Sequence, residues 1–101
     1  MYIYKLERSY FDTPTGAMKD KGEVTVCDPT YYSSKEKAIH VLDKRIERLK
    51  SRDFNIISIC GADNMRTNTI YNVVLIDSEA VLREYGYNTV IQYTITKIEV
   101  K

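Results

Sequence analysis

Aromatic or apolar side chains alternate with more polar ones along the first part of the chain. In residues 2–11, Tyr2, Tyr4 and Leu6 fall on one side of this alternation, which has the period of a half-buried β-strand. The alternation resumes at residues 24–26, so we expect a second strand there.

Residues 12–22 separate these two strands and concentrate turn-forming and charged side chains without periodicity. The sequence therefore predicts a long hairpin loop. Loops of this length often carry function, and a small domain also tolerates them without one, so both interpretations stay open.

The clearest helical pattern begins at Ser33. Ser33 is the predicted N-cap, and Glu36 can reach back to the Ser33 amide in a capping box. Apolar side chains then recur at spacings of three and four and form a single stripe, made by Ile39, Leu42, Ile46 and Leu49. This stripe predicts an amphipathic helix that covers a sheet.

Two further strands are expected after this helix. Residues 54–60 are apolar on both alternating sets, which favours a strand that is covered on both faces or lies centrally in the sheet. Residues 61–64 break the pattern, and residues 69–76 are again β-branched and apolar. A hairpin that pairs these two strands is the simplest arrangement.

The last part of the chain predicts a short helix and a final strand. Asp77 or Ser78 can cap a helical turn over residues 79–84, and Gly86 can close it in the left-handed conformation. Residues 89–100 alternate strongly, but their last apolar side chains fall on the opposite parity. This switch predicts either a bulge or a partner that covers the second face.

Together these elements predict a single domain over residues 1–101 with the order ββαββ(α)β. The fold class is α+β, with a mostly antiparallel sheet of about five strands and one long helix packed on one face. One helix covers only one face, so the other is expected to be solvated, covered by the short helix, or buried against another chain.

Tyrosine is the unusual feature of the composition. The chain has nine tyrosines, two phenylalanines and no tryptophan. Tyrosine joins a large apolar ring to a polar tip and therefore suits half-exposed surfaces that meet a partner. The candidate partner-binding residues are Tyr31, Tyr32, Tyr85, Tyr87, Lys44, Arg45 and Arg48.

No catalytic, metal-binding or nucleotide-binding motif stands out. His40, the only histidine, has no metal-ligand spacing with Cys27 or Cys60, and both cysteines have the β-forming neighbours typical of small core residues. A nucleophilic Cys–His pair would need proximity in space, and nothing near either thiol predicts a lowered pKa. We therefore expect no metal, no cofactor and no enzymatic activity.

The near balance of charges argues against a dedicated nucleic-acid binder. There are 15 basic and 14 acidic side chains, which give a net charge of +1. The N-terminus lacks the uncharged apolar core of a signal peptide, and no stretch approaches the length of a membrane span. We expect a cytoplasmic protein, located in the host cytoplasm if its source is viral.

The Ser-capped helix start at residues 33–38, the opening strand at residues 2–4 and the closing strand at residues 93–100 together resemble small uncharacterised phage and prophage accessory proteins. The resemblance covers most of the chain as a pattern of elements, and it carries over no functional residue. It implies a non-enzymatic role, such as binding and inhibiting a host protein, including proteins of defence systems.

Our leading hypothesis is a small binding protein that forms a homodimer and occupies a surface of another macromolecule. The surface tyrosines and the 12–22 loop would make the contacts. The alternative is a binder of single-stranded nucleic acid or of a nucleotide signal, which would use tyrosine stacking and the basic end of the helix.

Overall fold

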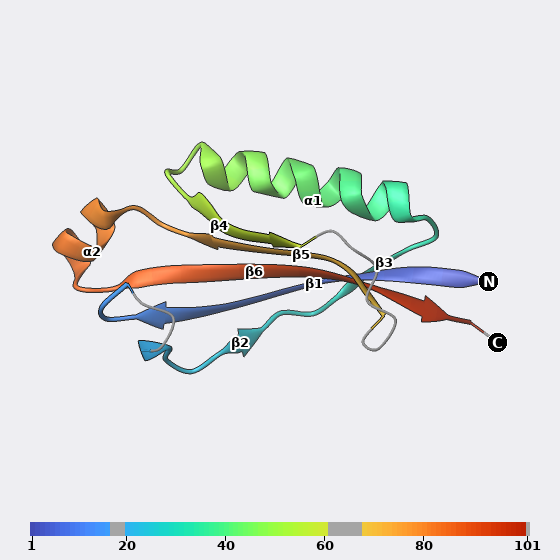
Figure 1. The fold of residues 1–101 in the computed structure, drawn as a ribbon, viewed down its shortest axis with the longest axis horizontal. Helices are drawn as coiled ribbons and strands as arrows, with labels where there is room; N and C mark the ends of the chain where they lie inside the picture. The colour runs from blue at the N-terminus through green and yellow to red at the C-terminus, as the bar shows by residue number, and fades with distance from the viewer. Residues whose placement is uncertain (17–19, 61–67, 101) are drawn as a thin grey trace.

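The computed structural model describes residues 1–16, 20–60 and 68–100, with only the backbone of Cys60, and forms an α+β fold (Figure 1). In chain order its elements are β1 (Tyr2–Thr13), β2 (Thr25–Val26), β3 (Thr30–Tyr32), α1 (Lys35–Lys50), β4 (Asn55–Cys60), β5 (Thr69–Ile76), α2 (Glu79–Tyr85) and β6 (Asn88–Glu99). The predicted order is confirmed, with one strand more than expected. The predicted turn over residues 61–64 lies outside the described residues.

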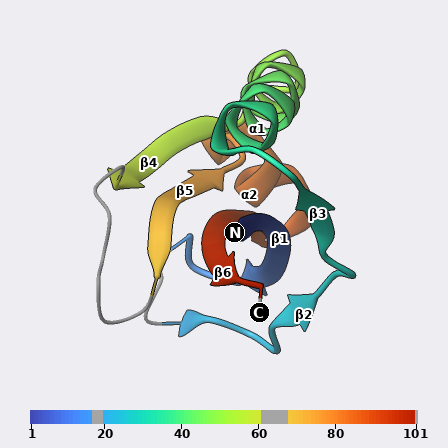
Figure 2. The same ribbon diagram turned by 90° about the vertical axis from the view of Figure 1, so that its right-hand side faces the viewer.

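All strand pairs are antiparallel, and the order across the sheet is β2-β1-β6-β5-β4 (Figure 2). The extra strand arises because two short segments, β2 and β3, both pair with the outer edge of β1. Asp28 and Pro29 separate them, and proline has no backbone N–H to donate to a ladder. The predicted pairing of residues 24–26 with the first strand is confirmed.

The long helix α1 begins one residue later than the sequence pattern predicts. Ser34, not Ser33, is the N-cap, because Ser34 has extended backbone angles and its Oγ accepts a hydrogen bond from the Lys37 amide at 3.2 Å. Two adjacent serines offer the same capping chemistry, and the sequence alone does not separate them. Neither α1 nor α2, the helices of the described residues, has the length and apolar character of a membrane span.

The core lies between α1 and the sheet face beneath it. The predicted stripe is largely confirmed, since Leu42, Ile46 and Leu49 are buried and Ile39 is half-buried. Ala38 is buried with them. The strands β1, β5 and β6 contribute seven buried side chains to this cluster: Leu6, Ile70, Val73, Leu75, Ile91, Tyr93 and Ile95.

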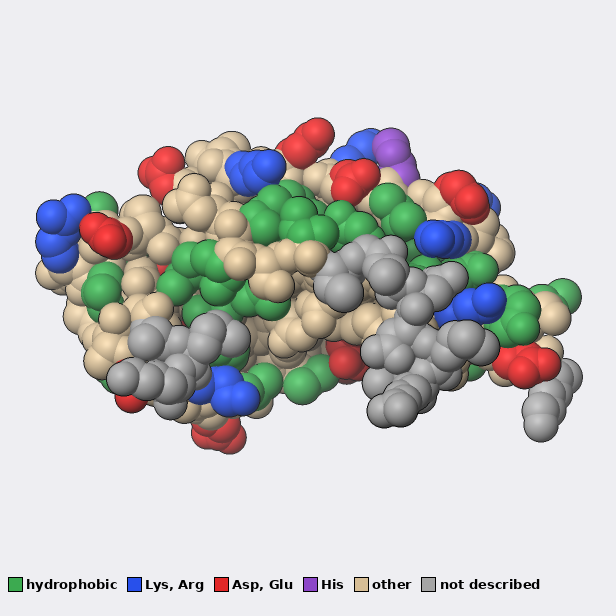
Figure 3. Space-filling view, in the orientation of Figure 1, with side chains coloured by type: hydrophobic (Ala, Val, Ile, Leu, Met, Phe, Trp, Pro, Cys, Tyr) green, Lys and Arg blue, Asp and Glu red, His purple; other side chains and the backbone are tan. Residues whose placement is uncertain are grey.

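β4 corrects a prediction. Residues 54–60 were expected to form a strand that is central or covered on both faces, but β4 is an edge strand. Its Ile57 and Ile59 side chains are 49% and 55% exposed. Figure 3 shows hydrophobic side chains in a band below α1, on the side of the molecule that carries β4 and β5. An apolar run does not reveal whether a strand has one neighbour or two.

Near the end of β6, the predicted bulge is absent against β1, but the register against β5 shifts between Thr69 and Tyr71. The register of β6 with β1 continues without a shift to the pair of Tyr2 and Glu99. Ile98 lies opposite Ile3, and both side chains are half-buried on the sheet face opposite α1. The switch of parity thus places a cross-strand isoleucine pair on this face, and a partner that covers the face stays a prediction.

We call the sheet face opposite α1 the open face. The exposure of its side chains changes along its length. In its middle, Ser9, Asn72 and Gln92 are half-exposed, and the Gln92 side chain donates to Asn72 Oδ1 at 3.2 Å. At the end that carries α2, Phe11 and Val90 on the same face are buried. Among the described residues, then, the second face is partly exposed and partly enclosed.

Candidate interaction surfaces

The structure distributes the seven predicted contact residues over three places. Tyr31 is 57% exposed on β3, whereas its neighbour Tyr32 is half-buried against the core. Tyr85 and Tyr87 lie at the far end of the molecule, on and just after α2 (Figure 1). The remaining three, Lys44, Arg45 and Arg48, lie on α1.

The two tyrosine pairs do not form one surface. Tyr31 lies opposite Lys5 on β1, and Asn88, next to Tyr87, lies opposite Thr13 on the same strand. Eight residues of extended strand correspond to about 26 Å at ~3.3 Å per residue. The molecule measures 49 × 25 × 23 Å, so one partner surface would have to follow its long axis to reach both pairs.

α2 presents the most exposed tyrosine. Tyr85 is 63% exposed and Tyr87 is 42% exposed. Gly86 between them ends the helix with φ of 81°, and its amide donates to the Leu82 carbonyl, which confirms the predicted left-handed cap. We call α2 together with Tyr85 and Tyr87 the α2 platform.

A buried polar network holds the α2 platform against the sheet. Asn88 is 3% exposed, and its Nδ2 donates to Asp77 Oδ1 at 2.5 Å and to the Ser78 carbonyl at 2.9 Å. Asp77 Oδ1 also accepts the Thr89 amide at 3.1 Å. These bonds join the residues before α2 to those after it, so both ends of the short helix are fixed to one another.

The start of the predicted 12–22 loop lies beside this platform. Asp12 Oδ1 accepts a hydrogen bond from Thr89 Oγ1 at 2.9 Å. Gly16 has φ of 76°, and a Cβ there would lie 3.0 Å from Asn88 Oδ1, so a side chain is both strained and crowded at this position. Residues 17–19 of the loop lie outside the described residues.

A second surface lies where α1 passes over β1 and β6. Arg8 on β1 donates from Nε and Nη2 to Cys27 Sγ, with both distances at 3.4 Å. These bonds raise the pKa of the Arg8 guanidinium; burial opposes the rise and a hydrogen bond with Tyr93 adds to it. From α1, the Arg45 guanidinium lies over the Tyr93 ring, 6.0 Å from its centroid.

We call Arg8, Cys27, Arg45 and Tyr93 the arginine surface. Arg45 was among the predicted contact residues, but sequence analysis missed Arg8. A signal was available, because Arg8 follows Tyr2, Tyr4 and Leu6 at alternate positions and so places a charge on the side of the strand that faces the core.

Cys27 and His40 do not form a nucleophilic pair. His40 is exposed on α1, and the Cys27 sulfur, predicted to lie in the core, is half-buried beside Arg8. The Cys60 side chain lies outside the described residues. Within the described ranges, no three His, Cys, Asp or Glu side chains are grouped so that they could hold a metal ion.

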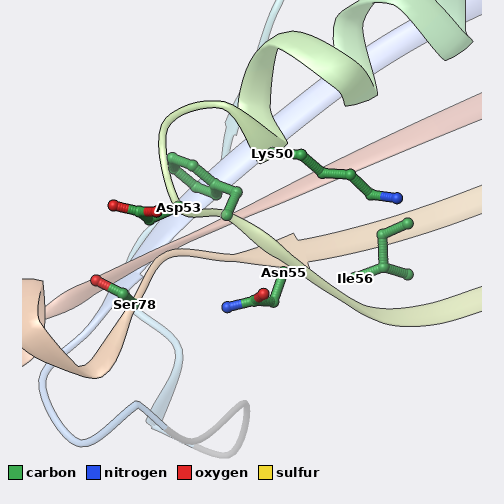
Figure 4. Close-up of a pocket in the computed structure, with 6 residues that line it drawn as sticks. Lys50, Asp53, Asn55, Ile56 and Ser78 are labelled. Atoms are coloured by element: carbon green, nitrogen blue, oxygen red, sulfur yellow. The ribbon is translucent and has the colours of Figure 1, made fainter.

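A cavity of about 520 Å³ lies between the end of α1 and the start of α2. It is lined by Lys50, Asp53, Phe54, Asn55, Ile56 and Ser78. Its volume is in the range of small-molecule sites. In Figure 4, however, the Lys50 ammonium and the Asp53 carboxylate point in opposite directions, so the polar groups do not converge on one ligand position.

Comparison with protein families, with curated proteins and with solved structures finds no match for this chain. A function therefore has to be inferred from the geometry of the described residues.

Proposed function

We propose that this protein is a small non-enzymatic binding protein whose α2 platform occupies a surface of a partner protein. The observation that carries the proposal is the exposure of Tyr85 and Tyr87 on a helix whose two ends are fixed by the Asn88 network. Tyrosines dominate many interfaces, because they bury a large ring at a low cost in conformational entropy.

Fixing the platform before binding favours affinity. An interface side chain that must be ordered on binding costs about 0.5–1.5 kcal/mol, and a preorganised support reduces such losses. As the resemblance to phage accessory proteins suggests, we propose that the partner is a host protein, such as a component of a defence system, and that binding takes place in the cytoplasm.

The proposal predicts that the double variant Tyr85→Ala/Tyr87→Ala binds its partner at least tenfold more weakly than the unchanged protein. The expected loss follows from the removal of two exposed anchors and corresponds to about 1.4 kcal/mol or more. The immobilised protein would capture the partner from a lysate of its natural host, mass spectrometry would identify it, and calorimetry would measure its affinity.

Tyr2→Ala is the matched control, because Tyr2 is 45% exposed and lies at the opposite end of the sheet. It should retain the affinity of the unchanged protein. Equal affinities for the double variant and the unchanged protein would refute a role of the α2 platform. Capture of no protein at all would refute the proposed function.

We also propose that the protein forms a homodimer by antiparallel pairing of β4 with β4 of a second copy. The two edges of the sheet differ, since the β2–β3 edge is short and interrupted by Asp28 and Pro29. In contrast, β4 has six residues without charge, proline or glycine, and it exposes Ile57 and Ile59. Charges, prolines and β-bulges are the usual means by which edge strands avoid pairing. Of these, β4 has only an irregularity between Ile56 and Ser58, which leaves residues 58–60 in regular register with β5.

Ile59→Lys should therefore shift the protein from dimer to monomer, because pairing would place a charge against the apolar edge of the second copy. Sedimentation velocity over a range of protein concentrations measures this shift. Val26→Lys is the control at the other edge, where Val26 is 59% exposed, and it should not change the distribution. A monomeric unchanged protein at high micromolar concentration would contradict the proposal.

A further inference from the structure

The arginine surface carries two guanidinium groups that are held in place by uncharged partners. Arg8 is fixed by two hydrogen bonds to the Cys27 sulfur, and Arg45 packs over the ring of Tyr93. Arg8 is nevertheless exposed to solvent, and Arg45 is half-exposed. Both side chains therefore lie at the surface in fixed positions, and a guanidinium group offers five N–H donors.

No carboxylate neutralises this pair in the part of the chain that the structure describes. The one ion pair there joins Lys5 to Glu7, at 3.9 Å. The side chains whose hydrogen bonds and electrostatic interactions raise the pKa of Arg8, those of Cys27 and Tyr93, include no carboxylate. Two oriented positive charges without a counter-charge favour a ligand that brings acidic oxygens, since guanidinium binds such groups in a planar, two-pronged geometry.

We infer that the arginine surface binds carboxylate groups on an acidic segment of a protein partner. The inference deepens the proposed function, and rests on it, by giving the chemistry of the partner. A protein fits better than a nucleic acid because Tyr93 is only 2% exposed, so bases cannot stack on its ring. The net charge of +1 also provides little of the long-range field that a phosphate backbone requires.

The test uses three probes of similar length and known chemistry: an octaglutamate peptide, an octaglutamine peptide and an oligothymidylate of eight nucleotides. Their dissociation constants are measured by NMR titration at low and at physiological salt. The unchanged protein should bind octaglutamate more tightly than the other two probes, and the perturbed amides should cluster around Arg8, Arg45 and Tyr93.

The double variant Arg8→Gln/Arg45→Gln should weaken octaglutamate binding about tenfold or more, because charged hydrogen bonds are lost. The control Lys50→Gln/Lys35→Gln removes the same number of positive charges as the arginine variant, but takes both of them from α1. Lys50 lies on the flank of the helix that faces β4, beside Ile56, and Lys35 lies at the other end of the helix. This control should change the dissociation constant less than twofold.

Three outcomes would overturn the inference: no binding of octaglutamate, an equal loss of affinity in the lysine control, or tighter binding of oligothymidylate that also depends on Arg8 and Arg45. The last outcome would indicate a nucleic-acid surface instead. Capture from lysate by the α2 platform is measured separately. Failure of the peptide test with intact tyrosine-dependent capture would remove the carboxylate site alone and leave the proposed function standing.

Discussion

Replacing Ile95 with alanine is expected to lower the free energy of unfolding by about 3–4 kcal/mol, which is the usual cost of truncating a fully buried isoleucine. Ile95 has no exposed surface and lies on β6, between Leu6 of β1 and Tyr71 of β5. α1 closes the core above it. Because Ile95 has neighbours on three sides, the surrounding side chains have little freedom to move into the space that the deleted atoms leave.

Urea unfolding followed by circular dichroism measures this change, and a thermal melt should show a midpoint lower by about 15 °C or more. Val26→Ala is the control, because it shortens a β-branched side chain that is 59% exposed and lies at the sheet edge opposite the proposed dimer contact. It should cost at most about 1 kcal/mol. A similar loss in both variants would mean that β6 does not lie at the centre of the core.

The contrast between Ile95 and Ile59 shows what the pattern of the sequence can and cannot predict. Both residues lie in apolar, β-branched runs, and both runs were correctly predicted to be strands. Which strand is central depends on the order of strands in the sheet, because each strand needs neighbours from distant parts of the chain. The local pattern carries no such information, so β4 was wrongly expected to be covered.

The helical elements were easier to predict, because their signals lie within a few residues. The apolar stripe of α1 follows from the 3.6-residue repeat, and Gly86 ends α2 in the conformation that glycine favours. The predicted N-cap of α1 was wrong by one residue, since Ser33 and Ser34 are adjacent and offer the same capping chemistry. Local chemistry thus determines the type of element better than its first residue.

The contact surfaces were only partly predictable, for the same reason. The count of tyrosines indicated that some rings would meet solvent, but not that Tyr93 would be buried and Tyr85 exposed. Arg8 and Cys27 are 19 residues apart in the chain, and the pairing of β1 with the segment after β2 brings them together. Such a cluster is a product of topology.

Asn88→Ala is expected to lower the free energy of unfolding by about 2–3 kcal/mol. The variant loses two hydrogen bonds from a side chain that is 3% exposed, to Asp77 and to the Ser78 carbonyl. Asp77 keeps the Thr89 amide as a donor, and the Ser78 carbonyl keeps the Val81 amide. The loss is therefore that of two hydrogen bonds, one of them to a carboxylate, together with a small cavity. Because the network joins the two ends of α2, the variant should also loosen the α2 platform.

Asn72→Ala is the control for this substitution. Asn72 makes a cross-strand bond with Gln92 on the open face, where both side chains are half-exposed and water can replace the lost partner. Its loss should therefore cost about 0.5–1 kcal/mol. Amide hydrogen exchange in α2 should accelerate in the Asn88 variant and not in the Asn72 variant. Equal stability and equal exchange in the two variants would show that α2 is held by its apolar contacts alone, and preorganisation by the Asn88 network could then no longer explain how the platform binds.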